Sequence, residues 1–167
     1  MSLMSPTILL ISIKKEYANM IFEGAKQVEL RRVRPRHLKE SDLVLVYVTS
    51  PEQALFGVFV VEKVVEMPTQ QLWNKYGDKT GLTYECFQKY YKNSTTGCAI
   101  LVREKITFES PIKLEKLREK WSDFRPPQSY YYLRDRDINI IKSMAKHDIL
   151  SLTQKGEVYQ TELITQS

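Results

Sequence analysis

The sequence predicts an α+β domain built on a mixed, partly closed β-barrel flanked by helices. Apolar runs rich in β-branched residues, which are typical of strands, alternate with segments of helical periodicity. A long strand pattern at residues 55–65 contains Gly57, which indicates a bulge or a close approach of another backbone. Long strands with bulges favour a small curved sheet over a flat one.

The N-terminal part of the chain is predicted to be mainly extended. Strands are expected at 7–13, 27–33, 43–48 and 55–65, from their apolar or alternating character. A helix between the first two strands is expected to end at Gly24, since glycine readily adopts the left-handed conformation that stops a helix.

Helical patterns dominate the remainder of the chain. Helices are expected at 70–76, 84–91, 113–121 and 137–145, with Thr83 as an N-cap. Short strands are expected at 99–102 and 106–108, and the prolines within 124–133 predict a loop.

Composition indicates one ordinary globular domain. The 167 residues are 43% hydrophobic and 27% charged, a balance that supports a buried core. The longest apolar stretch, Leu43–Val48, is far too short to span a bilayer, and the first residues lack the features of a secretory leader. We therefore expect a cytoplasmic protein. Its net charge of +5 favours an anionic partner, and no feature specifies an oligomeric state.

Metal and cofactor sites have little support in the sequence. Cys86 and Cys98 lack the spacing of zinc or redox motifs, and we interpret both as small hydrophobic residues. His37 and His147 have no acidic or cysteine companions at ligand spacing. We expect neither a metal nor a cofactor.

The most informative segment has the pattern Gly-x-Lys-x-x-Glu-x-Arg, from Gly24 to Arg31. Glu29 and Arg31 share one face of the predicted strand, so a carboxylate and a guanidinium point into the same space. Lys26 has the opposite parity and joins them only if the turn after Gly24 precedes regular strand geometry. The alternative is an exposed ion network that contributes little.

This segment resembles the motif of ASCH domains, which are similar to PUA domains in their barrel fold. The order of predicted elements agrees with that family from about residue 7 to residue 108. The resemblance implies an ASCH/PUA-like domain over 7–133 and a C-terminal helical extension over 134–167, packed on the same domain. It also implies binding of RNA or a modified nucleoside, with a role in gene regulation.

Further ligand contacts are expected from two segments at the edges of the cleft. They are Tyr47, Thr49 and Ser50 at the end of one strand, and Gln128, Ser129 and Tyr130 after the paired prolines. Amides and hydroxyls can hydrogen-bond a base edge, and aromatic rings can stack on one. Equally, the tyrosines of the second segment can pack the C-terminal part against the barrel.

A basic rim is expected beside the motif. Arg32, Arg34 and Arg36 are candidates for contacts with phosphates, which supply the sequence-independent part of nucleic-acid affinity. A merely solvated charged loop is the alternative.

The resemblance also implies an enzymatic alternative. One branch of the family hydrolyses the acetyl amide of N4-acetylcytidine with a lysine, a threonine and a glutamate. By motif, these positions correspond to Lys26, Glu29 and, more loosely, Asp78, so the threonine is replaced by a carboxylate. Some relatives are reported to cut RNA, so nuclease activity is a further alternative. A protein-interaction module with an unused cleft is the third possibility.

Overall fold

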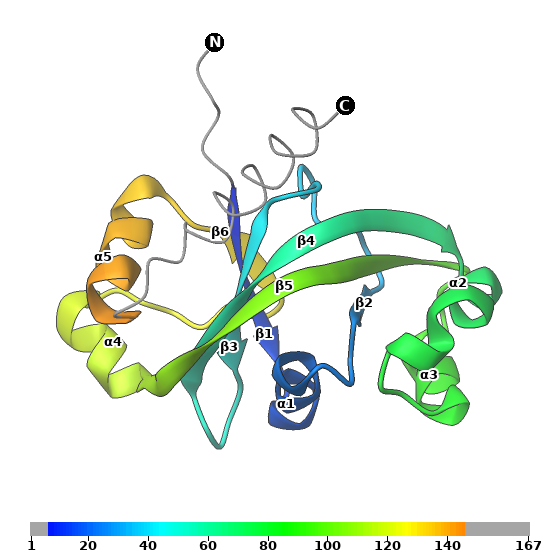
Figure 1. Ribbon diagram of the computed structural model, residues 1–167, viewed down its shortest axis with the longest axis horizontal. Helices are drawn as coiled ribbons and strands as arrows, with labels where there is room; N and C mark the ends of the chain where they lie inside the picture. The colour runs from blue at the N-terminus through cyan, green and yellow to red at the C-terminus, as the bar shows by residue number, and fades with distance from the viewer. Residues whose placement is uncertain (1–6, 146–167) are drawn as a thin grey trace, which may run out of the picture.

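The computed structural model describes residues 7–145, which form a single six-stranded sheet with helices around it (Figure 1). The strands are β1 (Ile8–Ile13), β2 (Val28–Arg31), β3 (Leu43–Val48), β4 (Ala54–Pro68), β5 (Thr96–Lys113) and β6 (Tyr130–Tyr132). The helices are α1 (Lys15–Glu23), α2 (Thr69–Tyr76), the 3-10 helix η1 (Gly77–Lys79), α3 (Tyr84–Tyr90), α4 (Leu114–Lys120) and α5 (Asp135–Ala145).

The sheet curls into a half-barrel, which confirms the predicted α+β class. Its strand order is β2-β5-β4-β3-β1-β6, with β1 and β3 parallel and the other neighbours antiparallel. The long pair β4 and β5 arches across the molecule, with α4 and α5 near one end and α2 and α3 near the other (Figure 1). The pairing of β4 with β5 shifts register at three places, and bulges of this kind bend a strand.

Gly57 lies where one of these shifts occurs. A Cβ atom built on it would stand 2.3 Å from the Ile106 carbonyl oxygen and 2.8 Å from the Phe22 ring of α1. The prediction of a close backbone approach at this glycine is therefore correct.

Both faces of the central strands are buried, which explains the continuous apolar run of β3. Leu43, Leu45 and Tyr47 point into one core, shared with α4 and α5. Val44 and Val46 point into the other, shared with α1. A strand buried on both faces has no polar positions to alternate.

Strand β2 divides its side chains between a third core and the opposite face. Val28 and Leu30 pack against the aromatic cluster of α2 and α3. Helix α3 is also tied to the backbone of β2, since the Tyr91 hydroxyl donates to the Arg31 carbonyl at 3.0 Å. Glu29 and Arg31 are consequently left on the other face, as their spacing predicted.

Two predicted segments need correction. The strands expected at 99–102 and 106–108 are one strand, β5, because pairing with β4 resumes at Lys105 after a register shift that passes over Arg103 and Glu104. The loop expected at 124–133 contains β6, whose three tyrosines pair with β1.

The predicted C-terminal extension is described only in part. Helix α5 carries Ile141 and Ala145 into the core that also contains Leu117 of α4. The rest of the extension, and His147 with it, lies outside the described residues. Within residues 7–145 we find no helix with the length and apolarity needed to cross a membrane.

Candidate functional site

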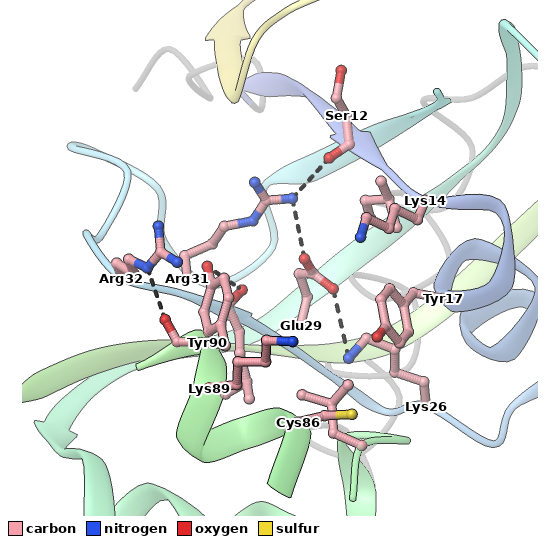
Figure 2. Close-up of a pocket in the computed structure, with 13 residues that line it drawn as sticks. Ser12, Lys14, Tyr17, Lys26, Glu29, Arg31, Arg32, Cys86, Lys89 and Tyr90 are labelled. Atoms are coloured by element: carbon pink, nitrogen blue, oxygen red, sulfur yellow. Dashed lines mark hydrogen bonds and ion pairs between the residues drawn. The ribbon is translucent and has the colours of Figure 1, made fainter. Parts of the chain in front are cut away.

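A cleft of about 540 Å³ opens between α1, β2 and α3 (Figure 2). Its volume falls within the range of about 300–1,000 Å³ that is usual for small-molecule pockets. The residues that line it are Ser12, Ile13, Lys14, Tyr17, Lys26, Glu29, Leu30, Arg31, Arg32, Leu82, Cys86, Lys89 and Tyr90.

The motif residues form the floor of this cleft. Lys26 and Glu29 are only 3% and 7% exposed. The Glu29 carboxylate lies between two cations, with Oε1 3.1 Å from the Arg31 guanidinium and Oε2 3.7 Å from Lys26 Nζ (Figure 2). The three heads therefore converge on one concave site, with Glu29 and Arg31 on one strand face as their spacing predicted, and they are not an exposed surface network.

Lys26 reaches the cleft because regular strand geometry starts only at Val28. Gly24 adopts φ 95°, the left-handed stop expected of it, and the Lys26 amide then donates to the Met20 carbonyl. The ammonium group donates to the Thr80 carbonyl at 2.6 Å. Burial lowers the pKa of Lys26, while the neighbouring Glu29 partly opposes this effect.

Arg31 is held by the first strand of the sheet. Its guanidinium donates to the Ser12 carbonyl at 3.0 Å as well as pairing with Glu29. A planar guanidinium fixed by two partners presents its remaining N–H groups in a defined direction. The charged floor is thus positioned by backbone carbonyls from two distant segments.

Two tyrosines form parts of the walls. Tyr17 comes from α1 and stands 5.5 Å from Lys26 Nζ, measured from the ring centroid. Tyr90 comes from α3, and the Arg32 guanidinium lies over its ring at 4.6 Å. Burial raises the pKa of both phenols, so both are neutral hydroxyls at physiological pH.

Positive charge predominates in the cleft. Its basic side chains are Lys14, Lys26, Arg31, Arg32 and Lys89, whereas Glu29 is the one carboxylate among the lining residues. Such an arrangement attracts anions, and a carboxylate at its centre adds a hydrogen-bond acceptor.

The other predicted contact residues lie outside this lining. Tyr47 points into the core beneath the opposite face of the sheet, where its ring packs 6.0 Å from that of Phe124. Alternation explains the difference, since Tyr47 has the parity of Leu45 along β3. Thr49 and Ser50 line a second, shallower hollow, which shares Lys14 with the cleft.

The segment after the paired prolines lies directly behind the cleft wall. The Ser12 amide donates to the Ser129 carbonyl at 3.1 Å, and the Ser12 hydroxyl donates to the Pro127 carbonyl at 2.6 Å. Gln128 is exposed next to them, and Tyr130 begins β6. Ligand contacts by this segment stay a prediction.

Of the predicted basic rim and the third hydrolase position, only Arg32 lies in the cleft lining. Arg32 lines the cleft, but Arg34 pairs with Glu66 at 3.8 Å and Arg36 is exposed farther along the loop. Asp78 is exposed on η1 and lines a different hollow. Of the three positions carried over from the hydrolase branch, only Lys26 and Glu29 share the cleft.

Several lining residues were not predicted from the sequence. They are Lys14 and Tyr17, at the start of α1 and within it, and Lys89 and Tyr90 of α3, and no local pattern shows that these helices face β2. The interpretation of both cysteines as small hydrophobic residues is wrong for Cys86, which is exposed at the cleft. Cys98 is buried, as that interpretation requires. No group of three or more His, Cys, Asp and Glu side chains within residues 7–145 is arranged to hold a metal ion.

Comparison with known proteins places the chain in a family. The model of the ASCH domain matches residues 11–123. A protein of Zymomonas mobilis named ASCH domain-containing ribonuclease is 31% identical over 134 residues, which are 80% of this chain and 89% of that protein. The crystal structure of ASCH from Zymomonas mobilis aligns with a TM-score of 0.76 at 30% identity, covering 81% of this chain and 94% of the other.

A more distant likeness concerns the fold alone. Human THYN1 protein, in a crystal structure with DNA containing 5-methylcytosine, aligns with a TM-score of 0.53 at 13% identity, over 85% of this chain and 99% of the other. The family match covers most of the chain and includes the motif that forms the cleft floor. The chain therefore belongs to the ASCH domain family, within the PUA-like superfamily.

Proposed function

We propose that the cleft binds single-stranded RNA, with one unpaired nucleotide inserted into it. The observation that carries the proposal is the excess of basic side chains around a buried, hydrogen-bonding floor. The Zymomonas mobilis relative named as a ribonuclease supports RNA as the class of partner.

The position of Glu29 divides the cleft into two parts. A phosphate placed on the floor would meet this carboxylate at close range, and like charges repel. A base has no net charge and can donate to the carboxylate. We therefore assign the floor to the base and the exposed cations Lys14, Arg32 and Lys89 to the phosphates.

Depth explains why the nucleotide should be unpaired. Lys26 and Glu29 are almost fully buried, so a base within a duplex cannot reach them. An unpaired base can enter and stack on Tyr17 or Tyr90, and stacking on an aromatic ring contributes about 1–3 kcal/mol per base.

The neighbouring hollow suggests a path for a longer strand. Lys14 lines both the cleft and the hollow that contains Thr49 and Ser50. A strand that leaves the cleft past Lys14 would meet these hydroxyls, which agrees with their predicted role in binding.

Binding of a short, labelled single-stranded RNA, measured by fluorescence anisotropy, tests the proposal. We expect the wild-type protein to bind and Lys89→Ala to bind more weakly, because Lys89 lines the cleft. Lys116→Ala is the matched control, since it removes the same charge from an exposed position on α4. Absence of binding at low salt, or equal effects of the two substitutions, would refute the proposal.

RNA cleavage is a second candidate function, favoured by the name of the relative with 31% identity. Attack of a ribose 2′-hydroxyl on its own 3′-phosphate forms a cyclic phosphate and expels the 5′-oxygen of the next nucleotide, so one group must accept a proton and another must donate one. Burial, which lowers the pKa of Lys26, favours the neutral amine that accepts the proton, and water or the exposed Lys89 ammonium protonates the departing oxygen. Gel analysis should show products with the wild-type protein and none with Lys26→Met. Intact RNA in both samples would refute cleavage and leave RNA binding as the proposed function.

The amide-hydrolase alternative has weaker support from the geometry. The exposed Asp78 lies apart from the cleft, and Glu29 is already paired with two cations where the hydrolases have a threonine. We expect no release of acetate from N4-acetylcytidine by the wild-type protein. Chromatography of the reaction with wild type and with Glu29→Thr, which restores the hydrolase motif at that position, distinguishes this alternative.

A further inference from the structure

We infer that the cleft floor selects uracil among the RNA bases, through the imide edge formed by O2, N3–H and O4. This inference rests on the proposed function and deepens it by naming the base. It follows from the order of hydrogen-bonding groups on the floor, which is donor, acceptor, donor.

The order is fixed by the chemistry of the three side chains. Arg31 and Lys26 carry only donors, and the ionised Glu29 carboxylate carries only acceptors. Figure 2 shows Glu29 between the other two, with its oxygens directed at Arg31 and at Lys26. A ligand that pairs with all three must offer acceptor, donor and acceptor in that order.

Uracil offers this order along its Watson–Crick edge. Cytosine has an acceptor, N3, at the centre of the same edge, and this atom would face the Glu29 carboxylate without a proton between them. Adenine presents one acceptor beside one donor, and guanine presents one acceptor beside two donors. Uracil is thus the one standard RNA base that complements the floor completely.

The floor cannot easily rearrange to suit another base. Lys26 is held by the Thr80 carbonyl at 2.6 Å, and Arg31 by the Ser12 carbonyl at 3.0 Å. The Lys26–Glu29 contact of 3.7 Å is longer than a hydrogen bond, which leaves both groups able to engage a ligand. A buried site built to hydrogen-bond one pattern rejects the opposite pattern, because the mismatch leaves buried polar groups unpaired.

The test compares oligouridylate and oligocytidylate of equal length, each labelled at the same end, by fluorescence anisotropy with the full chain. We expect oligouridylate to bind roughly tenfold or more tightly, the discrimination typical of paired hydrogen bonds to a base edge. Oligomers of N3-methyluridine, which lack the central donor, should lose this advantage. Glu29→Gln, which removes the negative charge and replaces one of the two acceptor oxygens by an amide donor, should bring the uridine-to-cytidine ratio close to one.

The outcomes separate this inference from the proposed function. Equal binding of the uridine and cytidine oligomers by the wild-type protein overturns uracil selection and leaves RNA binding standing. Binding of neither oligomer overturns both. Circular dichroism shows whether Glu29→Gln folds, and if it does not, the N3-methyluridine oligomer decides the matter with the wild-type protein alone.

Discussion

Glu29 links function and stability at the level of single residues. It is the common partner of Lys26 and Arg31, so each cation of the floor depends on it for neutralisation. Burial of a charge is tolerated when an opposite charge and hydrogen bonds accompany it. Removal of one partner is costly because the remaining buried charge is left uncompensated.

The free energy of unfolding should therefore respond asymmetrically to substitutions on the floor. Glu29→Ala leaves the buried Lys26 without its carboxylate, and we expect a loss of about 3–5 kcal/mol. Lys26→Met leaves Glu29 paired with Arg31, so the loss should be clearly smaller. Urea denaturation of both variants measures the difference. Equal losses would show that Glu29 does not neutralise Lys26 in the folded protein.

Cys98 should lower the free energy of unfolding as the pH rises into the alkaline range. Burial raises the pKa of its thiol from an ordinary 9.0 to about 12. The folded protein therefore retains a proton that the unfolded chain loses between these pH values. The corresponding stability is fully present below pH 9 and is lost as pH rises towards 12.

Comparison with Cys98→Ala isolates this effect from the other titrating groups, which both proteins share. At one pH unit above the ordinary thiol pKa, the wild type should have lost about 1.4 kcal/mol more than the variant, relative to neutral pH. Urea denaturation at neutral pH and near pH 10 supplies the four free energies. Parallel losses in the two proteins would contradict the assignment.

The residues of the floor were predictable, whereas those of the walls were not. Alternation along β2 placed Glu29 and Arg31 on one face, and Gly24 indicated the turn that lets Lys26 join them. Tyr17 and Tyr90 belong to separate helices, and their meeting at the cleft depends on long-range packing that leaves no local pattern in the sequence.

At the level of elements, strands β4 and β5 connect the curvature of the sheet to the cleft. At Gly57 of β4, the Ile106 carbonyl of β5 and the Phe22 ring of α1 both lie directly against the glycine backbone. The same helix carries Tyr17 into the cleft wall. One of the three register shifts in the long strand pair and the docking of α1 therefore meet at a residue without a side chain.

Gly57→Ala should destabilise the protein strongly. Its methyl group would stand 2.3 Å from the Ile106 carbonyl oxygen, so the paired strands must separate, at an expected cost of roughly 3 kcal/mol. Gly24→Ala is the comparison, because its Cβ has no contact closer than 3.4 Å and it suffers only the left-handed φ, a cost of about 1 kcal/mol. Thermal unfolding ranks the two, and a larger loss for Gly24→Ala would be inconsistent with the tight contact.

Sequence patterns identified most elements but misplaced those that depend on distant partners. The helix N-cap at Thr83 was predictable because its hydroxyl accepts from the Cys86 amide within the same turn. The continuity of β5 across Arg103–Lys105 was not, since it depends on pairing with β4 on either side of a register shift at these charged residues. Strand β6 exists through its pairing with β1, which no pattern within 124–133 indicates.

For the molecule as a whole, the position of the positive charge matters more than its total. The net charge of +5 alone favours an anionic partner, but the cleft concentrates several of these cations around one carboxylate. Arg34, predicted as a phosphate contact, lies 3.8 Å from Glu66. Cations already paired within the protein release fewer counterions when nucleic acid binds.

The salt dependence of RNA binding should reveal which cations contact phosphates. For a single strand, the slope of log Kobs against log salt is negative, and its magnitude decreases by about 0.7 for each phosphate contact that is lost. We expect Lys14→Ala and Lys89→Ala each to lower the magnitude of the slope by about this amount, because both lysines are exposed and line the cleft. Arg34→Ala should lower this magnitude less, since Arg34 lies outside the cleft lining and close to Glu66, and Lys116→Ala should leave it unchanged. Anisotropy titrations at several salt concentrations provide the slopes, and an equal decrease for the control and the cleft variants would mean that RNA is attracted by net charge rather than held at the cleft.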